Sequence, residues 1–145
     1  MLAKLICTIW ILIATLKCIP CAADIYVVAS AALPLNQLSE QQVRKLFLGR
    51  LPLLPETQVE PEVFDLPAKH PLYEPFYSHI SGMTAQKLKR YRAYYLFSGK
   101  GKLPTQIESR EDLIERLENT DAGVGYTDVL DGNDKIKVLY KIKTR

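Results

Sequence analysis

Cysteine is scarce in this chain of 145 residues, and all three cysteines lie within the first 21 positions. They are Cys7, Cys18 and Cys21. The rest of the chain therefore has no thiol for catalysis, for binding a soft metal or for forming a disulfide. Its stability has to come from a packed core rather than from covalent cross-links.

Long apolar runs are also lacking, apart from one at the N-terminus. Residues 5–16 form an apolar run behind Lys4, and this run is too short to span a bilayer comfortably. Pro20 follows it, and small residues then occupy the positions before Asp24. This order predicts a cleavable signal peptide over residues 1–23, with the cut after Ala23.

Two alternatives to a cleaved signal are disfavoured. A retained anchor would need a longer apolar segment or a repeated charged face. A lipidation site would need small residues before the cysteine, whereas Cys18 follows Leu16-Lys17 and Cys21 follows Ile19-Pro20. We therefore expect a periplasmic or secreted protein that does not span the membrane after cleavage. Residues 24–145 are long enough for one domain.

The usual catalytic signatures are missing. There is no Gly-x-Ser-x-Gly elbow and no His-Glu-x-x-His helix, and the carboxylates between Glu108 and Asp121 have the spacing of a helix surface. Gly123 and Gly125 lack the third glycine and the Lys-Ser or Lys-Thr of a nucleotide loop, so we interpret them as packing glycines. His70 and His79 do not have a spacing that brings both to one metal ion. The sequence predicts no enzyme, no cofactor and no metal site.

An excess of one charge is lacking as well. Without Lys4 and Lys17, 17 basic residues remain against 16 acidic ones, which disfavours a nucleic-acid binder. The distribution is more informative, because residues 75–107 contain no acid, whereas residues 108–121 are mostly acidic. We expect one basic and one acidic face. The cations of the first segment are Lys87, Lys89, Arg90, Arg92, Lys100 and Lys102.

What is present is an alternation of strand and helix patterns, which predicts a single α/β domain. Expected strands cover residues 24–30 and 62–66, and another follows the glycine turn at 121–126. Expected helices cover residues 40–48 behind Ser39, a segment starting near 72–74 and ending at Gly82, a segment capped by Thr84, and one starting at Ser109. In the last strand, Ile136, Val138, Tyr140 and Ile142 alternate with lysines, with Leu139 on the polar side. This pattern predicts a sheet edge with lysines in water.

Four motifs in order resemble the phosphate-binding proteins of ABC transporters (PstS-like). They are Phe47-Leu48-Gly49-Arg50, Phe76-Tyr77, Tyr95-Leu96-Phe97-Ser98-Gly99-Lys100-Gly101 with Pro104 beyond, and Ala122-Gly123-Val124-Gly125-Tyr126. The chain is most similar to small, exported, single-lobe relatives of these substrate-binding proteins. The resemblance implies one lobe of a type II periplasmic-binding-protein fold, with a mixed sheet flanked by helices.

The resemblance also implies where an anion would bind, because the family uses an arginine and a Ser-Gly-Thr turn at a helix start. Those three positions fall here on His70, Pro71 and Leu72, and an apolar residue near Leu66 replaces the arginine. If two lobes bind phosphate at about −8 kcal/mol, one lobe alone would bind near the millimolar range. The residues expected around a weak anion site, alone or in a homodimer, are Lys69, His70, Tyr73, Tyr126 and Thr127. For His70 alone, an exposed loop histidine is favoured over an anion ligand.

A second function class remains open, in which the lobe is an interaction or sensory module. The basic helix that begins after Thr84 would then dock onto an envelope transporter or sensor through Lys87, Arg90 and Arg92.

Overall fold

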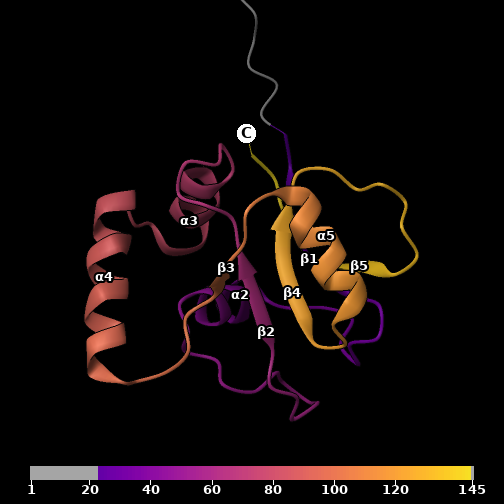
Figure 1. The fold of residues 1–145 in the computed structure, drawn as a ribbon, viewed down its shortest axis with the longest axis horizontal. Coiled ribbons are helices and arrows are strands. Elements are labelled where there is room, and N and C mark those ends of the chain that lie inside the picture. The colour runs from indigo at the N-terminus through magenta and orange to yellow at the C-terminus, as the bar shows by residue number, and fades with distance from the viewer. Residues whose placement is uncertain (1–22, 145) are drawn as a thin grey trace, which may run out of the picture.

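The computed structural model describes residues 23–144, so the predicted signal peptide and the three cysteines lie outside the described residues. The described part contains a five-stranded mixed sheet and four helices (Figure 1). The strands are β1 (Ile25–Ser30), β2 (Glu62–Asp65), β3 (Thr105–Gln106), β4 (Gly123–Thr127) and β5 (Ile136–Ile142). The helices are α2 (Glu40–Phe47), α3 (Tyr73–Ser81), α4 (Ala85–Ser98) and α5 (Arg110–Asn119).

The strand order in the sheet is β3-β2-β4-β1-β5. Strand β2 runs parallel to β3 and β4, whereas β1 runs antiparallel to β4 and β5. This confirms the expected α/β fold with a mixed sheet. The sequence did not predict β3, because a two-residue strand is too short to carry an alternating pattern.

The two faces of the sheet are covered by different helices, and β4 shows which helix covers which face. A Cβ atom on Gly125 would lie 2.4 Å from Leu113 Cδ1 of α5, so the glycine allows α5 to pack closely. On the opposite face the Tyr126 ring stacks on Phe76 of α3 at 3.8 Å and meets Phe47 of α2 at 5.6 Å. Both glycines of the turn therefore act in packing, as predicted.

The helix starts agree with the predicted caps. Ser39 forms a complete capping box with Gln42, and the Thr84 and Ser109 side chains accept hydrogen bonds from backbone N–H groups in the first turns of their helices. Helix α3 begins at Tyr73, inside the predicted window, and ends at Gly82 in the left-handed conformation. These local signals depend on only a few neighbouring residues, which explains why the sequence sufficed to find them.

The predicted alternation of β5 is wrong at its centre, where Val138 is exposed and Leu139 is buried. The register with β1 shifts between Val27 and Val28, because Val27 pairs with Tyr140 and Val28 pairs with Val138. Leu139 is the extra residue of this bulge and is buried, whereas Val138 is exposed. A bulge exchanges the faces on either side of it, and a period-two pattern cannot detect that change. The position of β5 at a sheet edge is confirmed.

Helix α4 lies at one end of the long axis of the molecule and touches the rest through one side only (Figure 1). Leu88 and Tyr95 are its buried residues. Tyr91 donates a hydrogen bond to the Leu48 carbonyl oxygen at 2.8 Å, and Tyr95 Oη lies 2.6 Å from the Gly49 carbonyl oxygen. These tyrosines tie α4 to the turn after α2.

Among residues 23–144, none of the helices is both long and apolar enough to cross a membrane.

Candidate functional site

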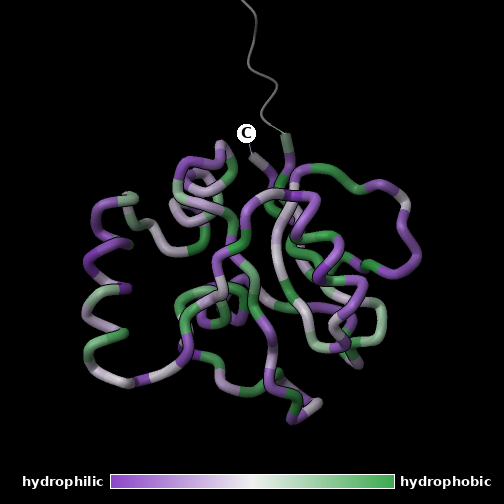
Figure 2. The backbone as a smooth tube through the Cα atoms, viewed as in Figure 1, coloured by the Kyte–Doolittle hydropathy of each residue, from purple (hydrophilic) through white to green (hydrophobic). Residues whose placement is uncertain are grey.

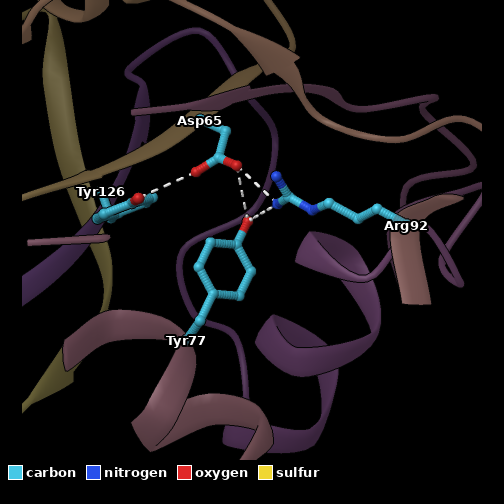
Figure 3. Close-up of polar contacts among 4 residues, drawn as sticks. All are labelled: Asp65, Tyr77, Arg92 and Tyr126. Carbon is cyan, nitrogen blue, oxygen red and sulfur yellow. Dashed lines mark hydrogen bonds and ion pairs between the residues drawn. The ribbon is translucent and has the colours of Figure 1, made fainter. Parts of the chain in front are cut away.

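A buried polar cluster lies at the carboxyl end of β2, where the resemblance placed the anion site (Figure 3). Its centre is Asp65, the last residue of β2, with only 1% of its side chain exposed. Arg92 Nη2 of α4 lies 2.6 Å from Asp65 Oδ2, and the Tyr77 hydroxyl of α3 donates to the same oxygen at 3.1 Å. Tyr126 of β4 donates to Asp65 Oδ1 at 2.9 Å. Four elements therefore meet at a single carboxylate.

Aromatic rings enclose the guanidinium of this cluster. The Arg92 Cζ atom lies 4.8 Å from the ring centre of Tyr77 and 5.6 Å from that of Tyr73. Arg92 Nη2 also donates a hydrogen bond to Tyr77 Oη at 2.5 Å. Contact with ring faces stabilises a cation that has lost part of its water. The arginine is thus held by one carboxylate, one hydroxyl and two rings.

Burial dominates the protonation behaviour of the cluster. Desolvation raises the pKa of Asp65, and the positive charge of Arg92 and the hydrogen bonds to the carboxylate work in the opposite direction. Burial, followed by the nearby Asp65 carboxylate, raises the pKa values of Tyr77 and Tyr126 far above the ordinary tyrosine range. Both tyrosines are therefore hydrogen-bond donors at every physiological pH.

Arg92 and Asp65 form an ion pair with each other, so the cluster is not an open anion site. The charge of Arg92 is neutralised by Asp65, and both oxygens of Asp65 already accept hydrogen bonds. An incoming anion would have to displace the carboxylate, which would leave a buried charge without a partner. In the arrangement seen here, Arg92 holds α4 against the sheet.

Lys69 and His70 lie in the loop that precedes α3, and Tyr73 is the first residue of α3. These are the first three residues expected at the anion site. Lys69 is exposed, His70 is partly exposed, and Tyr73 is buried against Tyr77, with ring centres 4.9 Å apart. Three backbone N–H groups at this helix start have partners within the chain. His70 donates to the Pro67 carbonyl oxygen, Leu72 to His70 Nδ1, and Tyr73 to the His70 carbonyl oxygen.

These bonds use the donors that an anion would need at a helix start. Pro71 and Pro75 have no N–H at all, and Glu74 adds a negative charge in the first turn of α3. An oxyanion site needs free N–H donors and a positive or neutral environment. This helix start offers fewer free donors and carries a negative charge.

The other two expected residues, Tyr126 and Thr127, are not brought together by the structure. They are adjacent in β4, so their side chains point to opposite faces of the sheet. Tyr126 is fully buried in the polar cluster, on the same face as Tyr73. Thr127 lies on the face of α5, where its hydroxyl bonds within the turn to Val129. Thr127 is therefore remote from Lys69 and His70.

The three cations expected to dock onto a partner do not all lie on the outer surface of α4. Lys87 and Arg90 are exposed, whereas only 21% of the Arg92 side chain is exposed, because it points inward to Asp65. A position four residues after Leu88 falls on the same side of a helix as that buried leucine. The assignment of Arg92 to the partner-facing surface is therefore corrected.

The exposed half of α4 carries apolar residues to which the sequence analysis assigned no role in binding. Phe97 is 94% exposed, and Tyr94 and Leu96 are each 64% exposed. Figure 2 shows the same change along α4, from hydrophilic residues in its first half to more hydrophobic ones in its second half. In the sequence, these three residues fall outside the Leu88–Tyr91–Tyr95 stripe, and this could have identified them as exposed. This signal was missed because aromatic residues in a helix are usually assigned to the core.

We call the outer face of α4 the docking face, and define it as Lys87, Arg90, Tyr94 and Phe97. Leu96 is also exposed but points to a different side of the helix, because residues two apart do not share a face. No acidic residue occurs between residues 75 and 107, so this face is positive and apolar at once. Isolated exposed apolar residues are ordinary, but three of them within one turn of a rigid helix are typical of interaction surfaces.

Comparison with known proteins identifies structures that share this fold. No family model and no curated protein matches the chain. Solved structures do match, among them a phosphate ABC transporter substrate-binding protein from Clostridium perfringens with bound phosphate, with 12% identity and a TM-score of 0.64. That match covers 81% of this chain and 45% of the other. The fold is that of one lobe of a PstS-type phosphate-binding protein.

Two further structures support the same lobe. An ABC-type phosphate transport receptor from Vibrio cholerae is 14% identical with a TM-score of 0.59, and PstS from Borrelia burgdorferi is 11% identical with a TM-score of 0.62. Each match covers 81% of this chain, and 46% and 47% of the other chain, respectively. The chain thus spans less than half the length of these PstS-type proteins, as expected for a single lobe. The likeness is one of fold.

Proposed function

We propose that this protein is an exported, non-enzymatic PstS-type lobe that recognises another protein through the docking face of α4. The observation that carries the proposal is Phe97, an aromatic side chain 94% exposed on a helix that the Arg92–Asp65 ion pair holds in place. Aromatic and arginine side chains are the residue types that most often dominate protein interfaces.

Rigidity makes this face suited to binding. The inner side of α4 is fixed at three points, by Arg92 on Asp65, by Tyr91 on Leu48 and by Tyr95 on Gly49. A helix held in this way presents its outer side chains without first having to become ordered. Binding therefore costs less conformational entropy than docking a mobile segment would.

Capture of a small anion by the lobe alone has less support. The N–H groups before α3 bond within the chain, and the nearest arginine is paired with Asp65. What remains for an anion is Lys69 and part of His70, both near the surface. Exposed charges of this kind hold a small ion only weakly.

The charge of the docking face indicates the chemistry of the partner. A helix face with Lys87 and Arg90 in its first half and Phe97 near its end fits an acidic surface that contains an apolar hollow. If the signal peptide is cut as expected, an exposed domain of an envelope transporter or sensor would be available to meet it.

A capture experiment on envelope fractions tests the proposal. The protein is immobilised as the native chain, as Phe97→Ser and as Lys87→Ser/Arg90→Ser, and the bound proteins are compared quantitatively. Leu53→Ser is the matched control, because Leu53 is also an exposed apolar residue but lies in the loop after α2. We expect a specific partner that both α4 variants lose about tenfold or more and the control retains. Equal capture by all four proteins would overturn the proposal.

A further inference from the structure

An apolar hollow of about 190 Å³ lies at the other end of the molecule, between α5, β5 and the loop that follows β4. Ile114 of α5 and Ile136 of β5 form part of its wall. Three of its apolar residues are themselves exposed, namely Val129, Leu130 and Val138. An apolar hollow open to water is unfavourable unless something covers it.

The surroundings of this hollow are acidic. Residues 108–134 contain nine acids and two basic residues. Asp131 lines the hollow, and with Glu111, Glu115 and Glu118 it also lines the adjoining depression on α5. The nearby cations are already paired, because Arg110 bonds Asp131 at 2.6 Å and Lys135 lies 3.6 Å from Glu118. Several carboxylates therefore surround an apolar centre.

The docking face is the complement of this hollow in both respects. It presents an apolar projection, led by Phe97, among cations, whereas the hollow presents an apolar recess among carboxylates. We infer that the docking face of one copy inserts into the hollow of a second copy, with Phe97 against Leu130 and Val138. Lys87 and Arg90 would then lie towards Glu111 and Glu115. This inference rests on the proposal that the outer face of α4 is a docking surface.

The position of the two surfaces determines the symmetry of such an association. Helix α4 lies at one end of the long axis, and α5 with β5 lies at the other (Figure 1). Surfaces at opposite ends suit repeated head-to-tail addition, in which each copy uses its docking face on one neighbour and its hollow on another, and we assign the contact this symmetry. Copies then add in a row, and the end of each row keeps one docking face free for a different partner.

Sedimentation of the purified protein tests this arrangement. We expect the mass-average size to rise with concentration up to about 1 mM and the association to weaken with added salt, because oppositely charged surfaces meet. Native protein that stays monomeric throughout this range would overturn the inference.

Two single variants distinguish head-to-tail contact from any other mode. Phe97→Ser removes the projection and keeps the hollow, whereas Leu130→Asp spoils the hollow and keeps the projection. Each variant alone should be monomeric, and an equimolar mixture should give one-to-one dimers. Association of Leu130→Asp with itself would mean α4-to-α4 contact and would overturn the inference. Val129→Asp, at a neighbouring exposed loop position, is a second hollow variant in case Leu130→Asp folds poorly.

Charge reversal adds a test that simple damage to the fold cannot imitate. Lys87→Glu/Arg90→Glu should abolish association with the native protein, and Glu111→Lys/Glu115→Lys as the partner should restore it at least tenfold. Absence of rescue would count against the assigned pairing.

The envelope capture experiment keeps the two proposals separable. Leu130→Asp retains the docking face, so it should still capture the envelope partner. Native protein that captures that partner through α4 but never self-associates contradicts only the head-to-tail contact. Self-association without any α4-dependent envelope partner contradicts only the proposed function.

Discussion

Arg92 Nη2 lies 2.6 Å from Asp65 Oδ2, and this contact joins the middle of α4 to the end of β2. Asp65 also accepts hydrogen bonds from Tyr77 and Tyr126, so the same carboxylate links α3 and β4. Helices α3 and α4 and strands β2 and β4 are thereby joined at one buried carboxylate. The cluster fixes the position of α4, and this position determines which side chains of α4 face outward.

Arg92→Leu should destabilise the fold by about 3 kcal/mol, because it leaves the Asp65 carboxylate buried without its cation. The loss should be largest near neutral pH and smaller in acid. Without Arg92 the pKa of Asp65 rises further, and the carboxyl group becomes neutral by taking up a proton. Urea unfolding at several pH values measures both effects.

The double variant Asp65→Asn/Arg92→Leu is the control for this prediction. It removes both charges, so it should be less destabilised than the sum of the single variants. Additive losses would show that the two residues do not act as a pair in the folded protein.

Alkaline pH should unfold the protein through its buried tyrosines. The pKa values of Tyr73, Tyr77 and Tyr126 are raised above the ordinary value near 10 by burial. Above pH 10 the unfolded chain releases these protons while the folded chain keeps them, so stability falls as the pH rises. Below pH 10 this contribution to stability is fully present. Urea unfolding between pH 8 and pH 12 gives the slope.

Tyr126→Phe identifies the residue responsible. This variant removes one tyrosine that stays protonated in the fold, so the slope of stability against pH should decrease by about one proton. A slope equal to that of the native protein would show that Tyr126 does not contribute, whatever the loss of stability at neutral pH.

Gly125→Ala should cost about 1–3 kcal/mol, because the new methyl group would overlap Leu113 and push α5 away from β4. Thermal unfolding measures the cost. In a Leu113→Ala background the same substitution should cost less, because the truncated side chain leaves room for the methyl group. If Gly125→Ala alone is neutral, the close approach of α5 to β4 is not the reason for a glycine here.

The sequence predicted those parts of the fold that depend on neighbouring residues. Ser39, Thr84 and Ser109 marked three helix starts, since a cap involves only one helical turn. The mixed sheet and the single lobe followed from ordered motifs and are confirmed by the solved structures.

What the sequence could not give are contacts between distant residues. The partner of Arg92 lies 27 positions away, and the bulge at Leu139 depends on how β5 meets β1. The separation of Tyr126 from Thr127 onto two faces follows from strand geometry, and it went unrecognised because both residues were transferred from a family pattern as a pair. Phe97 belonged to one of the four motifs that carry the resemblance, but its exposure depends on the position of α4, which the motif does not reveal.

The central claim is that this lobe recognises a protein surface and does not capture a small anion by itself. Calorimetric titration of the purified protein with phosphate, with sulfate as the control for charge, tests the claim most directly. The account predicts no saturable binding up to millimolar phosphate, because backbone donors before α3 are bonded within the chain and the charge of Arg92 is paired with the Asp65 carboxylate. Micromolar binding that prefers phosphate to sulfate would contradict it.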